Sequence, residues 1–298
     1  MGRHIVVLGN CQTGALRATL SAMLPQDRVD AAMWMGSEPE ELGDLLTTTD
    51  VLVTSVPRDV AEAVLARHGS AARVIAVPTI YFAALHPDQS QFPLHGGGEL
   101  DGVTGPYHSK IVVWGWAHGI PPEEILASFT PETYARLGYY DQWPQSVALL
   151  REIFELTDLD FASWYLPVVR RGAFMLTNNH PRLDALVQMA RLVAVELGAA
   201  EDLAAYDWTQ ALPDGLLASG VSWPIYPGVG DHLDLPGAYA WRLVGGEVIG
   251  LERFVEASLA AYDEIDSSTL NMTHLHADPR FLAVLGDGRG VAAGGGVR

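Results

Sequence analysis

Residues 4–80 alternate between short apolar runs and stretches with the apolar spacing of helices, and this alternation limits the fold more than any other feature of the sequence. The runs are rich in β-branched residues, as buried strands are. Predicted strands cover residues 5–8, 29–35, 51–54 and 73–77, and predicted helices cover residues 13–24, 39–46 and 59–67. This order predicts an α/β fold with a parallel, doubly wound sheet.

From residue 109 onward the sequence becomes mainly helical, with predicted helices at 144–156, 181–197 and 251–262 and a short strand at 174–176. Residues 83–108 are rich in Gly, Pro and His without a regular period, which is typical of a functional or mobile loop. We therefore expect an α/β domain at 1–110 and a mainly helical part at 111–285, packed on it and forming one continuous domain or a separate one. Residues 286–298 hold six glycines and are expected to be a disordered tail.

Cys11 is the only cysteine, and it lies where the first predicted strand turns into the first predicted helix. Free amide groups and the positive end of the helix dipole can stabilise a thiolate at such a turn and lower its pKa. The position therefore favours a nucleophile. The alternative is a small buried apolar side chain, which free cysteines often are.

Two kinds of nucleotide-binding loop are excluded at this turn. Gly9 and Gly14 have the spacing of a phosphate-binding P-loop, but Ala15 and Leu16 stand where that loop needs Lys and Ser or Thr. The dinucleotide fingerprint needs a glycine where this chain has Cys11. The turn is therefore not predicted to bind a nucleotide in either of these ways.

Two chemistries of a cysteine nucleophile stay open from the residues alone. Cys11 and Arg17 have the Cys-x5-Arg spacing of cysteine phosphatases, although Ala18 replaces the Ser or Thr that usually follows. The other chemistry is acyl transfer, with Gln12 and the amides of the turn as oxyanion donors. A non-catalytic nucleotide-binding protein with an inert cysteine is a third alternative.

A set of short motifs in a common order resembles the WcbI-type capsular polysaccharide biosynthesis proteins over residues 4–262. The motifs are Gly-Asn-Cys-Gln at 9–12, Val-Pro-Thr-Ile-Tyr-Phe at 77–82, His-Pro-Asp at 86–88, Thr-Asn-Asn-His-Pro at 177–181 and Trp-Pro-Ile-Tyr-Pro at 223–227. The resemblance implies a layout like that of SGNH hydrolases. It also implies binding of coenzyme A or acetyl-CoA and transfer of an acetyl group to a capsule sugar.

Acyl transfer through a thiol needs a base, and His180 is the first candidate. It lies between a predicted strand end and a predicted helix, where Asp184 or Asn179 could hold it, although the same residues are also good capping chemistry. His86 is the rival base. We expect His86 and Asp88 to bind the acceptor sugar, with an Asx-type turn as the alternative; Asn179 is a further candidate substrate contact.

The remaining candidate contacts are aromatic or basic. Tyr81 could stack on an adenine or a sugar ring, although an aromatic residue after a strand is more often part of the core. Any phosphate contact falls on arginine, on backbone amides or on the single lysine. Candidate coenzyme A contacts are Asn10, Arg17, Lys110, Arg170 and Arg171.

Composition narrows the partners. The net charge of −18 opposes binding to nucleic acid or anionic lipid, so we expect a small-molecule donor and a carbohydrate acceptor. One cysteine excludes an internal disulfide, and His274, His276 and Asp278 lack a fourth ligand, so no metal site is predicted. No apolar run approaches the length of a membrane span or a signal peptide, which predicts a cytoplasmic protein. Homo-oligomerisation is left open.

Overall fold

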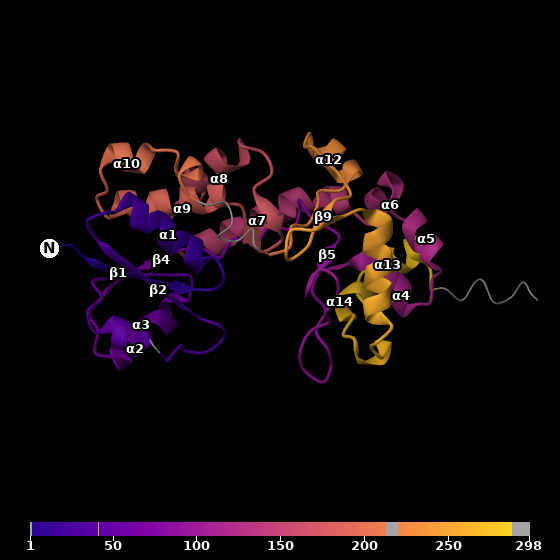
Figure 1. The fold of residues 1–298 in the computed structure, drawn as a ribbon, viewed down its shortest axis with the longest axis horizontal. Helices are drawn as coiled ribbons and strands as arrows, with labels where there is room; N and C mark the ends of the chain where they lie inside the picture. Colours follow the sequence, from indigo (N-terminus) through magenta and orange to yellow (C-terminus); the bar gives the residue numbers. More distant parts are fainter. Residues whose placement is uncertain (1, 41, 213–219, 288–298) are drawn as a thin grey trace, which may run out of the picture. The chain divides into compact units, whose positions relative to one another are not determined.

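The structure is a computed structural model that describes residues 2–40, 42–212 and 220–287 (Figure 1). The chain divides into two compact units, each made of two stretches of sequence. The first unit contains residues 1–82 and 146–218, and the second contains 83–145 and 219–298. This division differs from the expected boundary near residue 110, because helices that follow residue 146 return to the sheet of the first unit.

The sheet of the first unit has four parallel strands in the order β2-β1-β3-β4, which confirms the predicted α/β class. Ile5 of β1 lies opposite Val29 of β2 and Val51 of β3, so the strands start at the same level. The four strands are β1 (His4–Gly9), β2 (Arg28–Met33), β3 (Val51–Thr54) and β4 (Arg73–Ala76).

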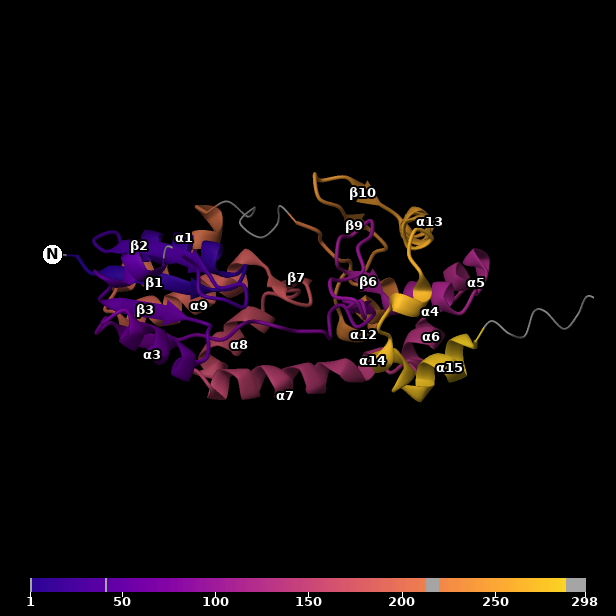
Figure 2. The same cartoon turned by 90° about the horizontal axis from the view of Figure 1, so that it is seen from below.

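Helices cover both faces of this sheet, as a parallel sheet requires. On one face α2 (Leu42–Leu46) and α3 (Arg58–Arg67) bury a cluster that includes Val6 and Leu8. On the other face α1 (Thr13–Met23) packs against α9 (Leu183–Glu196), as Figures 1 and 2 both show. The N-terminal segment supplies only α1 to that face, so the later helices complete its cover.

Three of the remaining elements of the first unit were predicted, whereas α8, β8, α10 and η2 were not. The predicted helices at 144–156 and 181–197 are confirmed as α7 and α9, and the predicted strand at 174–176 is β7, shifted by one residue. The elements are α7 (Gln142–Glu155), α8 (Phe161–Val169), β7 (Met175–Thr177), β8 (His180–Pro181), α10 (Glu201–Ala205) and the 3-10 turn η2 (Trp208–Gln210).

The second unit has an aromatic core and short elements. Trp241 and Phe254 stack with ring centroids 4.0 Å apart, and Phe92 and Leu100 of the 83–108 segment are fully buried, so this segment is anchored by its own side chains. Its helices are α4 (Lys110–Ala117), α5 (Pro122–Ala127), α6 (Pro131–Arg136), α12 (Pro227–Leu233), α13 (Leu251–Tyr262), α14 (Thr273–His276) and α15 (Pro279–Leu285), with 3-10 turns η1 (Tyr139–Asp141) and η3 (Ser267–Thr269). Its strands pair as β5 (Gln89–Ser90) with β6 (His108–Ser109) and β9 (Trp241–Arg242) with β10 (Val248–Ile249).

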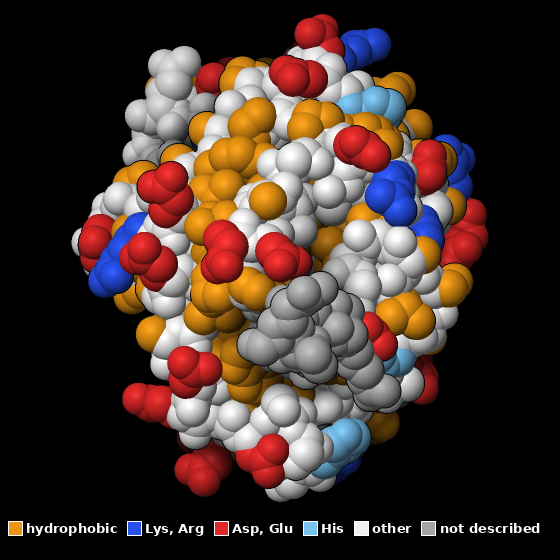
Figure 3. All heavy atoms as spheres, turned by 90° about the vertical axis from the view of Figure 1, so that its right-hand side faces the viewer, with side chains coloured by type: hydrophobic (Ala, Val, Ile, Leu, Met, Phe, Trp, Pro, Cys, Tyr) orange, Lys and Arg blue, Asp and Glu red, His pale blue; other side chains and the backbone are white. Residues whose placement is uncertain are grey.

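On one face of the second unit, acidic side chains are spread over an apolar surface (Figure 3). None of the helices in the described part of the chain is both long and apolar enough to cross a bilayer. At the start of the expected tail, the Gly286 carbonyl accepts a hydrogen bond from Trp114 Nε1 at 2.8 Å. From residue 288 onward the tail lies outside the described residues.

Candidate functional site

Cys11 lies in a tight turn between β1 and α1, as predicted. Asn10 Oδ1 accepts a hydrogen bond from the Gln12 amide at 3.0 Å, and the Asn10 carbonyl accepts one from Thr13 N at 3.0 Å. A Cβ on Gly9 would lie 2.3 Å from Ser55 Oγ, so a larger residue would force the Ser55 hydroxyl to move where the two strand ends approach. The Cys11 side chain is half-buried and is a free thiol.

The pKa of Cys11 moves in the direction opposite to the one expected. The backbone N–H groups of Cys11 and Gln12 lower it, as a turn at a helix N-terminus should. Burial raises it by more, so the pKa of the thiol lies above its usual value. The protonated thiol is therefore the stable form at neutral pH, and a nucleophilic Cys11 needs a base.

Gln12 is buried and ties three segments of the chain together. Its Nε2 donates to the carbonyl oxygens of Ile80 at 2.9 Å and Asn179 at 3.1 Å, and its Oε1 accepts from Ile80 N at 3.2 Å. Both N–H bonds of the side-chain amide are thus engaged. This corrects the expected role of Gln12 as an oxyanion donor: it is a positioning residue.

His180 follows directly after the carbonyl that Gln12 holds, so the turn of Cys11 and the turn of His180 are joined through one hydrogen bond. The His180 amide donates to Thr177 Oγ1 at 3.1 Å, and the Thr177 hydroxyl donates to Asn179 Oδ1 at 2.9 Å. Burial lowers the pKa of His180, so its imidazole is neutral at neutral pH, which is the form that accepts a proton.

A cavity of about 560 Å³ opens where β3 and β4 end. Ser55, Thr79 and Tyr81 line it, and Asn10 Nδ2 donates to Thr79 Oγ1 at 3.3 Å, which links the turn of Cys11 to the cavity. Tyr81 is 39% exposed, so its ring is not part of the core. Burial raises the pKa of Tyr81, and a hydrogen bond to Asn178 partly offsets this. Ser55 and Thr79 thus lie beyond the C-terminal ends of β3 and β4, as Cys11 lies beyond the end of β1, although Cys11 itself does not line the cavity.

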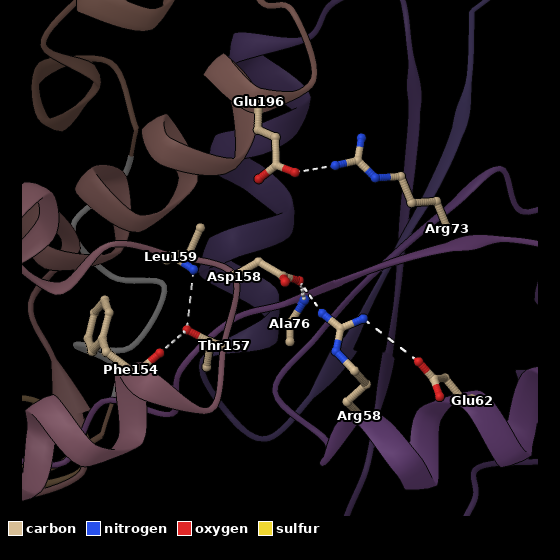
Figure 4. Close-up of polar contacts among 9 residues, drawn as sticks. All are labelled: Arg58, Glu62, Arg73, Ala76, Phe154, Thr157, Asp158, Leu159 and Glu196. Atoms are coloured by element: carbon tan, nitrogen blue, oxygen red, sulfur yellow. Dashed lines mark hydrogen bonds and ion pairs between the residues drawn. The ribbon is translucent and has the colours of Figure 1, made fainter.

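One wall of the cavity is formed by the end of α7, which no sequence motif connects with the site. Ile153, Leu156 and Thr157, at and just beyond the end of α7, line it together with Arg58 at the start of α3. Figure 4 shows Arg58 between Glu62 and Asp158, with Asp158 also accepting a hydrogen bond from the Ala76 amide at 2.7 Å. Leu156 is apolar and yet 81% exposed, which makes this wall an unusual surface.

Residues 4–202 match the family model described as polysaccharide biosynthesis enzyme WcbI. The chain belongs to the WcbI family. A solved WcbI structure superposes with a TM-score of 0.73 at 16% sequence identity, covering 97% of this chain and 97% of that one. That protein is described as a novel polysaccharide biosynthesis enzyme, in a native form without a disulfide bond between coenzyme A and one of its cysteines. No curated protein matches the chain.

The motifs that resemble WcbI-type proteins divide between the two units. Cys11, Tyr81, Asn179 and His180 belong to the first unit, whereas the His-Pro-Asp motif at 86–88 belongs to the second. The Asn179 side chain accepts a hydrogen bond from the Thr177 hydroxyl. Asn10 accepts a hydrogen bond from the Gln12 amide and donates one to Thr79. In this WcbI-family chain, the side chains of Asn10 and Asn179 therefore hold neighbouring residues of the site in place.

Asp88 is fully buried, which corrects its expected role as a sugar contact. Its carboxylate accepts hydrogen bonds from Tyr139 Oη at 2.7 Å, Tyr226 Oη at 2.8 Å and Ile111 N at 3.1 Å. These donors come from three separate segments, so Asp88 organises the second unit. His86 is 2% exposed, with its Nδ1 3.3 Å from the carbonyl of Pro224.

The basic candidates occupy different surroundings. Lys110 Nζ donates to the Pro87 carbonyl at 2.7 Å in the second unit, and burial lowers the pKa of Lys110. Arg170 is exposed at the C-terminal end of α8, and Arg171 lies 3.9 Å from a carboxylate oxygen of Asp207. Arg17 is exposed on α1.

The phosphatase alternative does not fit the turn. A phosphate-cradling loop directs successive amides at one point, but the chain is already helical from Thr13, so the second half of the Cys11-to-Arg17 segment bonds within α1. Among the residues that the structure describes, no group of three or more His, Cys, Asp or Glu side chains is arranged to hold a metal ion.

Proposed function

We propose that this protein is a coenzyme A-dependent acyltransferase that moves an acetyl group onto a sugar hydroxyl in the biosynthesis of a capsular polysaccharide. The observation that carries the proposal is the joined pair of turns: a half-buried free thiol, Cys11, and a neutral imidazole, His180, held together through Gln12 beside a cavity. The family, named for polysaccharide biosynthesis, supports a sugar acceptor.

Coenzyme A as the donor is supported by the likeness to a WcbI protein described with reference to a disulfide between coenzyme A and a cysteine. Cys11 is the only thiol in this chain, so any such contact falls on it. The half-buried thiol at the N-terminal end of α1 fits the thiol end of coenzyme A. We assign phosphate contacts to exposed Arg17 first, and to Arg170 and Arg171 of the same unit as further candidates.

In direct transfer, His180 removes the proton from the sugar hydroxyl as its oxygen bonds to the thioester carbonyl carbon. The carbon–sulfur bond then breaks, the electron pair leaves with the sulfur, and the imidazolium returns its proton to that sulfur. The positive N-terminal end of α1 stabilises the oxyanion that forms in between. Cys11 shapes the pocket in this route.

In covalent transfer, His180 takes the proton of Cys11, the Cys11 sulfur displaces coenzyme A from the acetyl carbonyl, and the imidazolium gives the proton to the departing coenzyme A sulfur. The sugar hydroxyl then displaces Cys11 from the same carbon, and the proton passes through His180 to the thiol. The raised pKa of Cys11 makes the base essential here. Cys11→Ser separates the routes, because it blocks covalent transfer and leaves direct transfer running.

The test is release of free coenzyme A from acetyl-CoA in the presence of sugar acceptors, measured with a thiol reagent, alongside thermal shifts with coenzyme A. Loss of a positioned general base lowers turnover about 100- to 10,000-fold, so we expect a drop of that order in His180→Ala. The control is His68→Ala, which removes a histidine of the same unit that pairs with Glu38. Wild-type turnover in His180→Ala and Cys11→Ser, or no stabilisation by coenzyme A, would refute the proposal.

A further inference from the structure

The residues that line the cavity beside the Cys11 turn favour one of the two substrates of the proposed reaction, the sugar acceptor, over the other, coenzyme A. Its walls are mostly apolar, with Val56, Pro57, Val77 and Ile153 among the lining residues. At about 560 Å³ it lies in the size range of small-molecule sites. The cavity can therefore hold a ring or a short chain and is not limited to a single acetyl group.

The charged side chains on this lining oppose an anionic occupant. Among the described lining residues, the charged side chains are Arg58, Asp59 and Glu62, one cation against two anions. Arg58 is already paired with Asp158, outside the lining, and lies 3.8 Å from Glu62. The phosphates of coenzyme A and the carboxylate of an acidic sugar would thus meet net negative charge with no unpaired cation to offset it.

The uncharged polar groups suit a sugar. Ser55 and the carboxylate of Asp59 offer oxygen atoms that can accept hydrogen bonds from hydroxyl groups. Tyr81 is half-exposed on the lining, so an apolar ring face is available beside these oxygens. An aromatic face next to hydrogen-bonding groups matches the alternation of C–H and O–H groups on a sugar ring.

We infer that this cavity is the acceptor subsite and that it takes an uncharged sugar, which lies against the Tyr81 ring and donates hydroxyl hydrogen bonds to Asp59. The inference rests on the proposed function and adds to it the charge class of the acceptor and the place where the acceptor binds. It also separates the substrates, because the donor's phosphates are kept out of this cavity.

The experiment is saturation-transfer NMR on the full chain with methyl glucoside, methyl galactoside and methyl mannoside, each compared with the methyl glycoside of its uronic acid. We expect signal from at least one neutral glycoside and about tenfold weaker binding of its uronic acid, which corresponds to about 1.4 kcal/mol. Tyr81→Ala should abolish the signal, and Tyr81→Phe should keep it. Tyr206→Ala, which removes an exposed tyrosine of the same unit, should match wild type.

Four results would overturn the inference: no neutral glycoside binds, a uronic acid binds as well as its neutral partner, Tyr81→Ala binds like wild type, or coenzyme A displaces the glycoside. Thermal shifts with coenzyme A, measured on the same samples, keep this failure distinct from failure of the proposed function. Stabilisation by coenzyme A together with any of these results removes the acceptor subsite alone. Absence of that stabilisation in wild type removes the acyltransferase.

Discussion

Gln12 in the first unit and Asp88 in the second are both buried polar side chains with three hydrogen-bond partners, yet their surroundings differ. Gln12 bonds only to backbone groups, and it leaves Cys11 and His180 half-buried. Asp88 bonds to two tyrosine hydroxyls and one amide, all in the interior. The comparison shows that residues of the family motifs have different roles in the two units. Gln12 positions a site that stays accessible, whereas Asp88 stabilises the interior.

The largest effect we expect comes from Asp88→Ala. Removal of the carboxylate leaves two tyrosine hydroxyls and the Ile111 amide without their partner in the core. The free energy of unfolding should fall by about 3–5 kcal/mol, measured by urea denaturation. Asp88→Asn, which keeps one acceptor oxygen, should lose clearly less. Equal stability of Asp88→Ala and wild type would remove the distinction between the two units.

A pH dependence should follow from His108, also in the second unit. Its Nδ1 accepts from Tyr262 Oη at 2.7 Å and its Nε2 donates to the Leu100 carbonyl at 2.9 Å, and burial lowers its pKa from 6.5 to about 4. Between these values the unfolded chain binds the proton and the folded one does not, so stability falls as the pH drops through this window. The loss amounts to about 3 kcal/mol by pH 4.

The measurement is urea denaturation across that window for wild type and His108→Gln. The variant lacks the titrating group, so its stability should change less with pH than that of wild type, whatever its stability at neutral pH. A variant with the same slope as wild type would show that His108 is not the source.

Gln12→Ala should have the smallest effect on stability of the three changes. It removes three hydrogen bonds to loop backbone, and the free energy of unfolding should fall by about 1–3 kcal/mol. Because the residue joins the turns of Cys11 and His180, turnover should fall as well, with a larger change in kcat than in KM. The control is Gln26→Ala, an exposed amide of the same unit. Unchanged turnover in Gln12→Ala would mean that Gln12 does not position the site.

The parallel sheet and the position of Cys11 could be predicted because both depend on local patterns. The runs at 5–8 and 51–54 are apolar enough to form strands by themselves. A cysteine that directly follows such a strand must lie at the carboxyl end of the parallel sheet. His180 was expected by the same argument between a strand end and a helix, but it begins β8, which pairs antiparallel with β7 outside the parallel sheet. The motif order identified the family for the same reason, since it is read directly from the chain.

The roles of Asp88 and Gln12 could not be predicted in this way, since they depend on partners far along the chain. Asp88 reads as an exposed turn residue until Tyr139 and Tyr226 are known to point at it. Gln12 resembles an oxyanion donor until Asn179 is found to use its N–H group. The direction of the Cys11 pKa likewise depends on how deeply the thiol is buried, which the turn sequence does not specify.

The central claim is that Cys11 meets the thiol end of coenzyme A, and thiol–disulfide exchange tests it directly. The Cys11 thiolate attacks the disulfide of oxidised coenzyme A, forms a mixed disulfide and releases one coenzyme A thiolate. Intact-mass spectrometry with peptide mapping should show one coenzyme A attached at Cys11, formed faster than the adduct from oxidised glutathione under equal conditions. Equal rates with the two disulfides, or no adduct at Cys11, would contradict the account.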